Sequence, residues 1–275
     1  GPLMMVTEVL GEILLPKFMS MIINHGVAQK DGGYILKMGL VMAITSFLMA
    51  AGGILGAYFA AKASISFTSD LRRDLFARVQ QFSFKNIDHF STSGLVTRMT
   101  TDITNVQMAY MMSIRLLARA PIMIILSWVM TLVLNKTVAM LFLIVIPLLG
   151  GTLIFIAKKA HPHFIKVFDE YDVLNNSVQE NVNASRVVKA FVREDYEIDK
   201  FHIISKYVYS LFTKAEKIVA WNSPVMQFTM YVVILVIVAI GGNSIVTGTM
   251  QTGELTSIIV YSLQILMSLM MVTFV

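Results

Sequence analysis

The sequence contains no cysteine and few charged residues. The absence of cysteine excludes disulfide bonds and thiolate metal sites. Only 14% of the residues are Asp, Glu, Lys or Arg, against about 25% in typical soluble domains, and the mean hydropathy is +0.71. Because so little of the chain is suited to contact with water, the composition predicts a membrane protein.

Histidine is also scarce, and its arrangement does not favour a metal site. Among the five histidines, His161 and His163 are close in sequence, but Pro162 between them keeps their rings off one helical face. We therefore expect no metal ligands in this chain. That it also has no catalytic residues is an expectation that depends on the family resemblance described below. The net charge of +5 follows from membrane topology and does not indicate nucleic-acid binding.

Long uncharged stretches are the main positive feature of the sequence. No charged side chain occurs in residues 38–61, 137–157, 218–253 and 255–275. A helix needs about 20 predominantly apolar residues to cross the hydrocarbon core of a bilayer. With two further apolar stretches, the pattern predicts six spans, at about 3–24, 34–61, 107–134, 137–160, 218–246 and 255–275.

The basic residues give the orientation of these spans. Most of the 22 Lys and Arg residues lie in or beside the segments 62–106 and 157–217, whereas the loops on the opposite side are short. Basic residues concentrate on the cytoplasmic side of membrane proteins. We therefore expect cytoplasmic hairpins at 62–106 and 161–217 and cytoplasmic N- and C-termini. A bacterial plasma membrane is a separate expectation, which the basic residues do not establish.

The cytoplasmic segments keep a helical period. Within SDLRRDLFARVQQF, the apolar residues fall at helix spacing: Leu71, Leu75, Phe76, Val79 and Phe82. We expect one helix from Tyr34 to Gln81, about 72 Å long at 1.5 Å per residue. The same argument predicts a helix from Thr137 to about Ala190, with bends at Pro147 and Pro162. It also predicts a helix from about Asp199 to Val246, with Pro224 as a kink.

Each predicted hairpin ends in a tip that mixes aromatic and charged residues. The first tip is FKNIDHFSTSG, residues 84–94, and the second is AFVREDYE, residues 190–197. Exposed aromatic side chains at such places suggest a surface that docks on a soluble partner. The alternative is an exposed helical turn that binds nothing.

Several motifs around the tips occur in a specific order. HFSTSGLVTRMTTDITNV precedes the third span, RVVKAFVREDYE contains the second tip, TGTMQTGEL precedes the last span, and RLLARAP lies at the start of the third span. In this order and spacing, the motifs resemble the transmembrane domain of an ABC exporter half-transporter. RLLARAP is similar to the corresponding segment of heterodimeric multidrug-type members.

This resemblance, which covers essentially residues 1–275, implies a fold and a function. The fold is an all-α membrane protein in which six long transmembrane helices extend into the cytoplasm, of the domain-swapped ABC exporter type. The function is translocation of multidrug or lipid-like amphipathic substrates. Two halves, as a homodimer or heterodimer, pair around a central pathway, and ATP hydrolysis on separate nucleotide-binding domains drives alternating access. ATP and Mg²⁺ belong to those domains.

The resemblance also implies that both tips are coupling helices seated in the nucleotide-binding domains. The contact residues it implies are Lys85, Asn86, Ile87, Asp88, His89 and Phe90 in the first tip, and Phe191, Arg193, Glu194 and Asp195 in the second. Phe90 and Phe191 are expected to act as apolar plugs, and the charged residues of the second tip as polar clamps.

Polar residues within the spans are candidates for the lining of a substrate cavity: Arg115, Arg119, Trp221, Gln227 and Gln264. Charged residues in spans usually face a bundle interior or a water-filled cavity. The alternatives are snorkelling of the arginines to lipid headgroups and interfacial anchoring by the tryptophan. Methionine, with 20 residues, suits a promiscuous pocket, although most of these side chains are expected to face lipid or other helices.

Glu8 and Glu12 share one face of the first span. Binding a cation, carrying protons, and pairing with Lys17 or with an arginine on a neighbouring helix are all compatible with this placement, and we favour pairing. A proton-coupled secondary transporter that uses Glu8 or Glu12 is one alternative function. A non-transporting dimeric membrane module is another.

The sequence departs from the family pattern at both ends. The first span starts almost at residue 3, so we expect the elbow helix of the family to be missing. The sequence contains no GxxxxGK[ST], the loop whose backbone amides and lysine cradle phosphates. We therefore expect no nucleotide-binding domain and no ATP hydrolysis by this chain alone.

Overall fold

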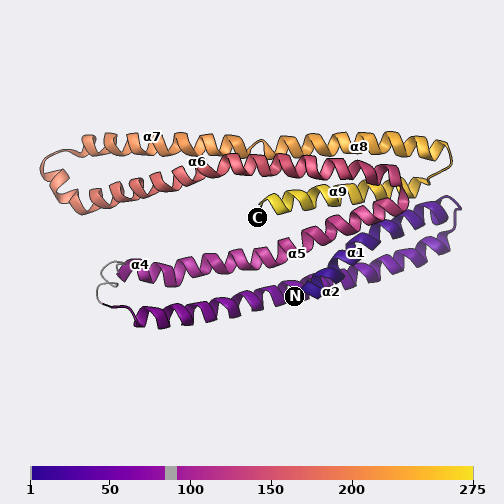
Figure 1. Ribbon diagram of the computed structural model, residues 1–275, viewed down its shortest axis with the longest axis horizontal. Helices are drawn as coiled ribbons and strands as arrows, with labels where there is room; N and C mark the ends of the chain where they lie inside the picture. Colours follow the sequence, from indigo (N-terminus) through magenta and orange to yellow (C-terminus); the bar gives the residue numbers. More distant parts are fainter. Residues whose placement is uncertain (1, 84–91, 275) are drawn as a thin grey trace. The chain divides into compact units, whose positions relative to one another are not determined.

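The computed structural model describes residues 2–83 and 92–274. These residues form helices joined by short turns, without any strand among them (Figure 1). They divide into two compact units. The first takes in the described residues up to Val145 and from Val232 onward, and the second is Ile146–Tyr231. The expectation of an all-α membrane fold is confirmed.

Most helices of the described chain are long, and both of its π-helical segments and its one short helix belong to the first unit. The first unit contains α1 (Pro2–Met21), η1 (Ile22–Val27), α2 (Gly32–Gln80), α4 (Thr92–Thr97), η2 (Arg98–Asp102), α5 (Ile103–Leu134) and α9 (Thr252–Phe274). The second unit contains α7 (Glu194–Val219), and it shares α6 (Lys136–Ala190) and α8 (Asn222–Val246) with the first.

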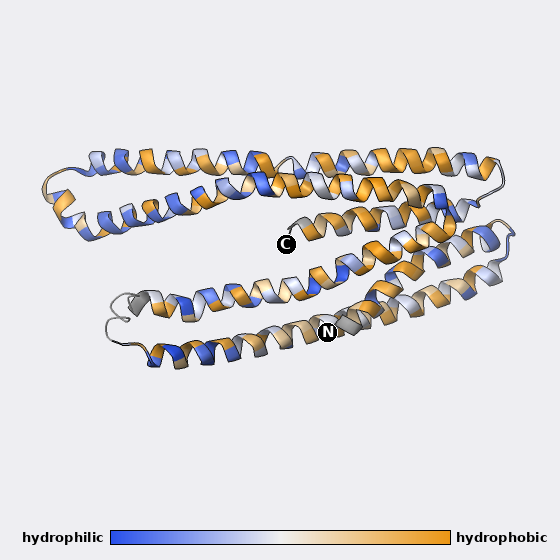
Figure 2. Ribbon diagram, viewed as in Figure 1, coloured by the Kyte–Doolittle hydropathy of each residue, from blue (hydrophilic) through white to orange (hydrophobic). Residues whose placement is uncertain are grey.

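Five stretches of the described chain are long and apolar enough to cross a membrane: 32–80, 94–134, 136–190, 194–246 and 252–272. Helix α1, predicted as the first span, is not among them because it carries Glu8, Glu12 and Lys17. Figure 2 shows apolar residues concentrated in α8, α9 and the first half of α6, and hydrophilic residues in α7 and the second half of α6. The chain is an integral membrane protein.

Helix α2 is a single helix of 49 residues that begins at an Asp31 cap, whose carboxylate accepts a hydrogen bond from the Tyr34 N–H at 3.0 Å. Small residues recur at every fourth position along one of its faces and are buried: Gly52, Gly56, Ala60, Ser64 and Thr68. Small side chains let membrane helices approach closely. This stripe packs on α1 through its glycines, and the Ser64 hydroxyl donates to the backbone carbonyl of Gln107 in α5 at 2.8 Å.

Helix α9 binds to α1 where a proline interrupts the hydrogen bonding of α1. Pro16 has no N–H, so the carbonyl of Glu12, four residues earlier, lacks its usual intrahelical donor. Gln264 Nε2 donates to this carbonyl at 3.3 Å, and the Tyr261 hydroxyl donates to the carbonyl of Ile13 at 2.8 Å. A neighbouring helix thus satisfies the freed backbone group, as a membrane environment requires.

The long helix predicted over 199–246 is interrupted, because α7 ends at Val219 and α8 begins at Asn222. Pro224 explains the break. It has no N–H to donate to the carbonyl of Ala220, and its ring clashes with that carbonyl in a continuous helix. In the first turn of α8 the missing donor has no cost, since the N–H groups there have no intrahelical partner. The residue read as a kink therefore starts a new helix.

Candidate functional site

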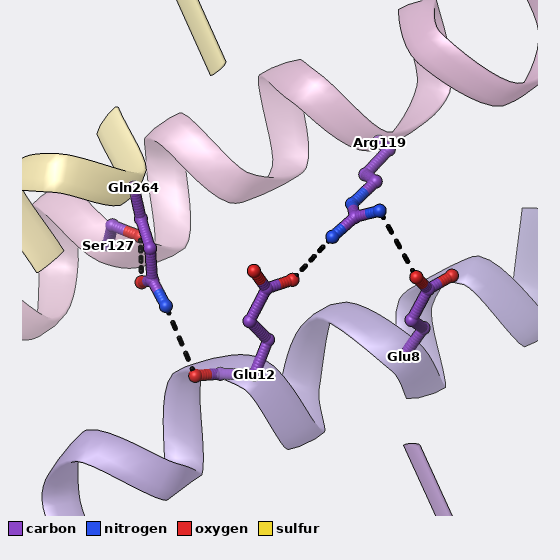
Figure 3. A network of polar contacts seen from close by, with 5 residues as sticks. All are labelled: Glu8, Glu12, Arg119, Ser127 and Gln264. Carbon is purple, nitrogen blue, oxygen red and sulfur yellow. Dashed lines mark hydrogen bonds and ion pairs between the residues drawn. The ribbon is translucent and has the colours of Figure 1, made fainter. Parts of the chain in front are cut away.

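Three charged side chains from α1 and α5 form an ion-pair cluster in the first unit. Arg119 Nη1 lies 3.1 Å from Glu8 Oε1, and Arg119 Nη2 lies 2.6 Å from Glu12 Oε2 (Figure 3). The two glutamates share a face of α1 because they are four residues apart. Pairing of these glutamates with an arginine on a neighbouring helix is confirmed. Lys17 is exposed and takes no part in the cluster.

A glutamine connects this cluster to α9. The Ser127 hydroxyl of α5 donates to Gln264 Oε1 at 3.2 Å, while Gln264 Nε2 donates to the backbone carbonyl of Glu12 (Figure 3). The network therefore joins three helices whose contributing residues lie far apart in sequence. Its charged side chains are largely shielded, since Arg119 is 26% exposed, Glu8 17% and Glu12 30%.

Two glycines of α2 make room for Glu8. A Cβ at Gly53 would lie 3.3 Å from Glu8 Cδ, and one at Gly52 would lie 3.3 Å from the Glu8 backbone nitrogen and 3.2 Å from the Met4 carbonyl oxygen. Backbone atoms cannot move away easily from such a contact. The absence of a side chain at Gly52 therefore fixes the distance between α1 and α2 beside the cluster.

A pocket of about 350 Å³ adjoins the cluster between α1, α5 and α9. Its lining consists of Glu12, Arg119, Ala120, Met123, Val260, Leu263, Gln264, Met267, Ser268 and Met271. The volume lies at the lower end of the range of about 300–1,000 Å³ for small-molecule sites. An apolar wall rich in methionine faces a few polar groups, an arrangement that suits an amphipathic ligand.

The structure brings together two of the five residues predicted to line a substrate cavity, Arg119 and Gln264. Arg115, one turn earlier on α5, is exposed and is not part of this pocket. Trp221 and Gln227 belong to the second unit and are exposed, and Gln227 Nε2 donates to the Ser223 hydroxyl at 3.2 Å.

Sequence reasoning missed the contributions of Ser268 and of the α9 methionines to this pocket. A usable signal was present, because Val260, Gln264, Met267 and Met271 recur at intervals of three or four residues and so share one helical face. What the sequence did not show is that this face meets Glu12 and Arg119.

The second hairpin tip is a tight turn over residues 191–193. The Arg193 N–H donates to the carbonyl of Val188 at 3.0 Å, and the Val192 N–H donates to the carbonyl of Lys189 at 3.2 Å. This pattern is a Schellman closure, whose central residue adopts a left-handed conformation, and Val192 has φ 48°. Of the predicted coupling segment 191–197, residues 191–193 form this turn and residues 194–197 begin α7, so the segment is not a separate helix. Its coupling role stays a prediction.

Phe191 and Arg193 line a groove of about 520 Å³ at this tip, together with Ala184, Val187, Val188, Tyr196 and Glu197. Phe191 is 74% exposed. Glu194 and Asp195 lie in the first turn of α7, where the positive end of the helix dipole favours carboxylates. The tip thus presents an aromatic ring beside charged side chains, and a partner can reach it. Lys85, Asn86, Ile87, Asp88, His89 and Phe90 lie outside the described residues.

Side-chain contacts hold α6 and α7 together behind this tip. Asn181 Nδ2 donates to Glu197 Oε2 at 2.7 Å, and Lys200 Nζ donates to Glu180 Oε2 at 3.2 Å. The hydrogen bond and the negative charge of Glu180 raise the pKa of the Lys200 ammonium. These contacts fix the position of Glu197, which also lines the groove.

The chain resembles known proteins over nearly its whole length. A profile of the family described as ABC transporter transmembrane region matches residues 2–269. The uncharacterized ABC transporter ATP-binding protein YfiB of Bacillus subtilis is 33% identical over 99% of this chain and 48% of its own length. The uncharacterized ABC transporter ATP-binding protein Rv1273c of Mycobacterium tuberculosis is 28% identical over 98% of this chain and 47% of its own length.

A more distant relative has a more specific name. The ATP-dependent lipid A-core flippase of Desulfotalea psychrophila is 26% identical over 68% of this chain and 33% of its own length. The chain spans about half the length of the curated relatives that match it along its whole length.

Proposed function

The chain belongs to the family of ABC transporter transmembrane regions, and from this membership we propose that it is the membrane-spanning, substrate-translocating domain of an ATP-driven exporter. The match over residues 2–269 carries the proposal. The sequence has no phosphate-binding GxxxxGK[ST] loop, so in this proposal ATP and Mg²⁺ bind to nucleotide-binding domains and not to residues of this chain. The chain by itself is then no enzyme.

Coupling to those domains is assigned to the turn between α6 and α7. The exposed ring of Phe191 supplies an apolar plug, and Arg193, Glu194 and Asp195 supply charged contacts around it. The 55 residues of α6 form one helix that runs from this turn into the apolar part of the chain. A helix without a break transmits a displacement of the tip, and such transmission is what alternating access requires.

The substrate site is assigned to the pocket between α1, α5 and α9. Its methionine-rich wall and its polar groups favour an amphipathic substrate, drug-like or lipid-like. The lipid A-core flippase among the relatives supports the lipid-like class. In this proposal Gln264 contacts the polar end of the substrate, and Arg119, which also lines the pocket, holds Glu12 in position. The roles of Arg115, Trp221 and Gln227 in the pathway stay predictions.

A second transmembrane half, identical or homologous, is the second partner in this proposal. The cytoplasmic parts of α6 and α7 expose large apolar side chains such as Phe168, Val182, Ile203 and Tyr209. Exposure of this apolar surface to water is unfavourable, and packing against a domain-swapped second half would bury it. The basic residues of 62–106 and 161–217 support cytoplasmic termini, and the bacterial relatives support a bacterial plasma membrane.

The test is transport by the assembled transporter in proteoliposomes, with and without hydrolysable ATP. We expect transport to require ATP hydrolysis and to persist when the proton gradient is dissipated. Phe191→Ala should reduce transport at least about tenfold while ATP hydrolysis continues, since one hot-spot aromatic contributes 2 kcal/mol or more to a contact. Phe47→Ala is the control, because Phe47 is also a largely exposed ring, within the α2 span.

Two results would contradict the proposal. Transport that runs on a proton gradient without ATP would favour a secondary transporter. A chain that assembles but moves no substrate under either condition would favour a structural module. Full transport by the Phe191→Ala variant would remove the coupling role of this tip and leave the translocation role in place.

A further inference from the structure

The charges around the α1–α5–α9 pocket are unbalanced, and we propose that this pocket selects ligands that carry a positively charged group on an apolar body. The inference deepens the proposed function, on which it rests, by naming the charge of the substrate. It is carried by three features: the residual charge of the cluster, an unused hydroxyl in the pocket wall, and the apolar surface opposite them.

Two carboxylates share one guanidinium. Both terminal nitrogens of Arg119 are engaged, one by Glu8 and one by Glu12, so the formal charges of the trio sum to −1. Figure 3 shows the second oxygen of the Glu12 carboxylate outside both contacts with Arg119. Of the trio, Glu12 and Arg119 line the pocket. A ligand in the pocket therefore meets a carboxylate oxygen that Arg119 does not occupy.

No other charged residue on the helices packed around the cluster, α1, α2, α5 and α9, neutralises this charge in the described chain. On α1, Lys17 is exposed; on α5, Arg115 is exposed, and neither forms an ion pair in the part of the chain that the structure describes. Helix α2 has no charged residue over 38–61, and the single charged residue of α9, Glu254, lies in its first turn. In a low-dielectric surrounding, an unbalanced charge strongly favours an opposite charge beside it.

The pocket wall also contains a hydroxyl without a hydrogen-bond partner. Ser268 is only 8% exposed, and within the described chain no group hydrogen-bonds to its side chain, although it lines the pocket. Within the described chain, the fully buried side-chain atoms without a partner are Ser177 Oγ and Asn222 Oδ1, so the Ser268 hydroxyl keeps some access to the pocket. A ligand group in the pocket can therefore bond to it. A protonated amine has several N–H donors, which Glu12, Ser268 and the amide oxygen of Gln264 can accept.

The apolar wall determines the rest of the ligand. Met123, Leu263, Met267 and Met271 surround the polar groups and offer flexible, polarizable contacts. An anionic headgroup would meet the Glu12 carboxylate beside an arginine whose single positive charge is already shared by two carboxylates. A neutral ligand would not compensate the residual negative charge of the ion-pair cluster. An organic cation with an aromatic or alkyl body fits both parts of the pocket.

The test compares three fluorescent probes that share one ring system and differ in charge: 1-pyrenemethylammonium, 1-pyrenemethanol and 1-pyrenecarboxylate. Binding is measured on the assembled transporter in lipid nanodiscs, against empty nanodiscs that correct for partition into lipid. We expect the ammonium to bind at least about tenfold more tightly than the alcohol, and the carboxylate to bind most weakly.

Three variants locate the effect. Glu12→Gln should abolish the preference for the ammonium over the alcohol, and it should fold because Glu8 still pairs with Arg119. Ser268→Ala should weaken ammonium binding about three- to fivefold and leave carboxylate binding unchanged. Glu254→Gln makes the same chemical change on α9 away from the pocket and should keep the full preference. Thermal unfolding checks that each variant is folded.

The outcomes distinguish failure of this inference from failure of the proposed function. Equal binding of the ammonium and the alcohol, tighter binding of the carboxylate, or an unchanged preference in Glu12→Gln would overturn the cation selectivity even if transport is driven by ATP. Failure of ATP-driven transport would overturn the proposed function, whatever the order of probe affinities. An ammonium preference that Glu12→Gln removes and Glu254→Gln keeps supports the inference.

Discussion

Val192, at the turn between α6 and α7, holds a backbone conformation that β-branched residues seldom adopt. Its φ is 48°, and the left-handed region costs a residue with a Cβ about 1–2 kcal/mol. Glycine occupies this position of a Schellman closure in most helices. The strained residue stands between Phe191 and Arg193, the two tip residues that line the groove. Strain of this kind concentrates at sites of function.

Replacing this residue by glycine is predicted to stabilise the chain. Val192→Gly removes the left-handed strain and adds chain entropy to the unfolded state, which leaves a net gain of about 0.5–1 kcal/mol. Thermal unfolding in detergent measures the change. The control is Val187→Gly, a change on an exposed helical position of α6 that should destabilise by about 0.3–0.5 kcal/mol, the difference in helix propensity between valine and glycine. A lower transition temperature for Val192→Gly would contradict the argument.

Arg119 is predicted to be the residue of the ion-pair cluster that is least tolerant of truncation. Arg119→Ala leaves Glu8 and Glu12 unpaired between membrane helices, and removal of one partner from a shielded ion pair costs about 3–5 kcal/mol. Arg119→Lys should lie between wild type and alanine, because one ammonium cannot reproduce a guanidinium that bonds two carboxylates. The yield of folded protein and its thermal unfolding measure the series. Equal stability of all three proteins would show that the cluster does not hold α1 to α5.

At the scale of the helix, close packing depends on a few positions without side chains. Gly52 on α2 faces the backbone of α1, with the Met4 carbonyl oxygen 3.2 Å and the Glu8 nitrogen 3.3 Å from where a Cβ would stand. Gly39 on the same helix has no atom within 4 Å of that position. The two glycines therefore differ in surroundings while sharing one helix.

Alanine substitutions at these two glycines are predicted to act in opposite directions. Gly52→Ala should destabilise by about 1–3 kcal/mol, because α1 must shift to accept the methyl group. Gly39→Ala should be neutral or stabilise by up to about 1 kcal/mol through its higher helix propensity. Thermal unfolding of the two variants side by side measures the difference. The same effect at both positions would show that propensity, and not contact with α1, decides.

Helices that are marked by a repeating apolar pattern were predictable from the sequence. Breaks and turns that depend on one residue were harder to predict. The helical spacing of Leu71, Leu75 and Val79 predicted that the second helix continues past its apolar span. The structure confirms this with one helix from Gly32 to Gln80. Pro224 was predicted to kink a continuous helix. A proline can either bend a helix or end it, and the sequence around Pro224 does not distinguish these two outcomes. The Schellman turn escaped prediction because valine, and not glycine, occupies its left-handed position.

For the whole molecule, the candidate pocket depends on residues that no local pattern connects. Glu12, Arg119 and Gln264 come from three helices, and helical periodicity states only which face each occupies. The pairing of the glutamates with an arginine was predictable from the cost of an isolated charge in a membrane. The identity of that arginine, the partnership with Gln264 and the hydroxyl of Ser268 depend on packing and became visible only in the structure.

The break between α7 and α8 is predicted to act as a hinge during transport. Pro224→Ala restores the missing N–H and should let the helix continue across Ala220 and Trp221. A stiffer connection should slow ATP-driven transport several-fold without changing probe binding at equilibrium. Pro162→Ala is the control, because α6 is already continuous through that position. Unchanged transport by Pro224→Ala would show that the break is only a structural junction.

The bond from Gln264 to the carbonyl that Pro16 leaves without a donor has a consequence for the evolution of the family. A lineage that loses this proline regains the backbone N–H, and a hydrogen-bonding side chain at position 264 is then no longer needed to satisfy α1. A lineage that loses the glutamine first has a bare carbonyl in the bilayer until the proline changes as well. Substitutions at positions 16 and 264 should therefore be inherited together, with the proline lost first.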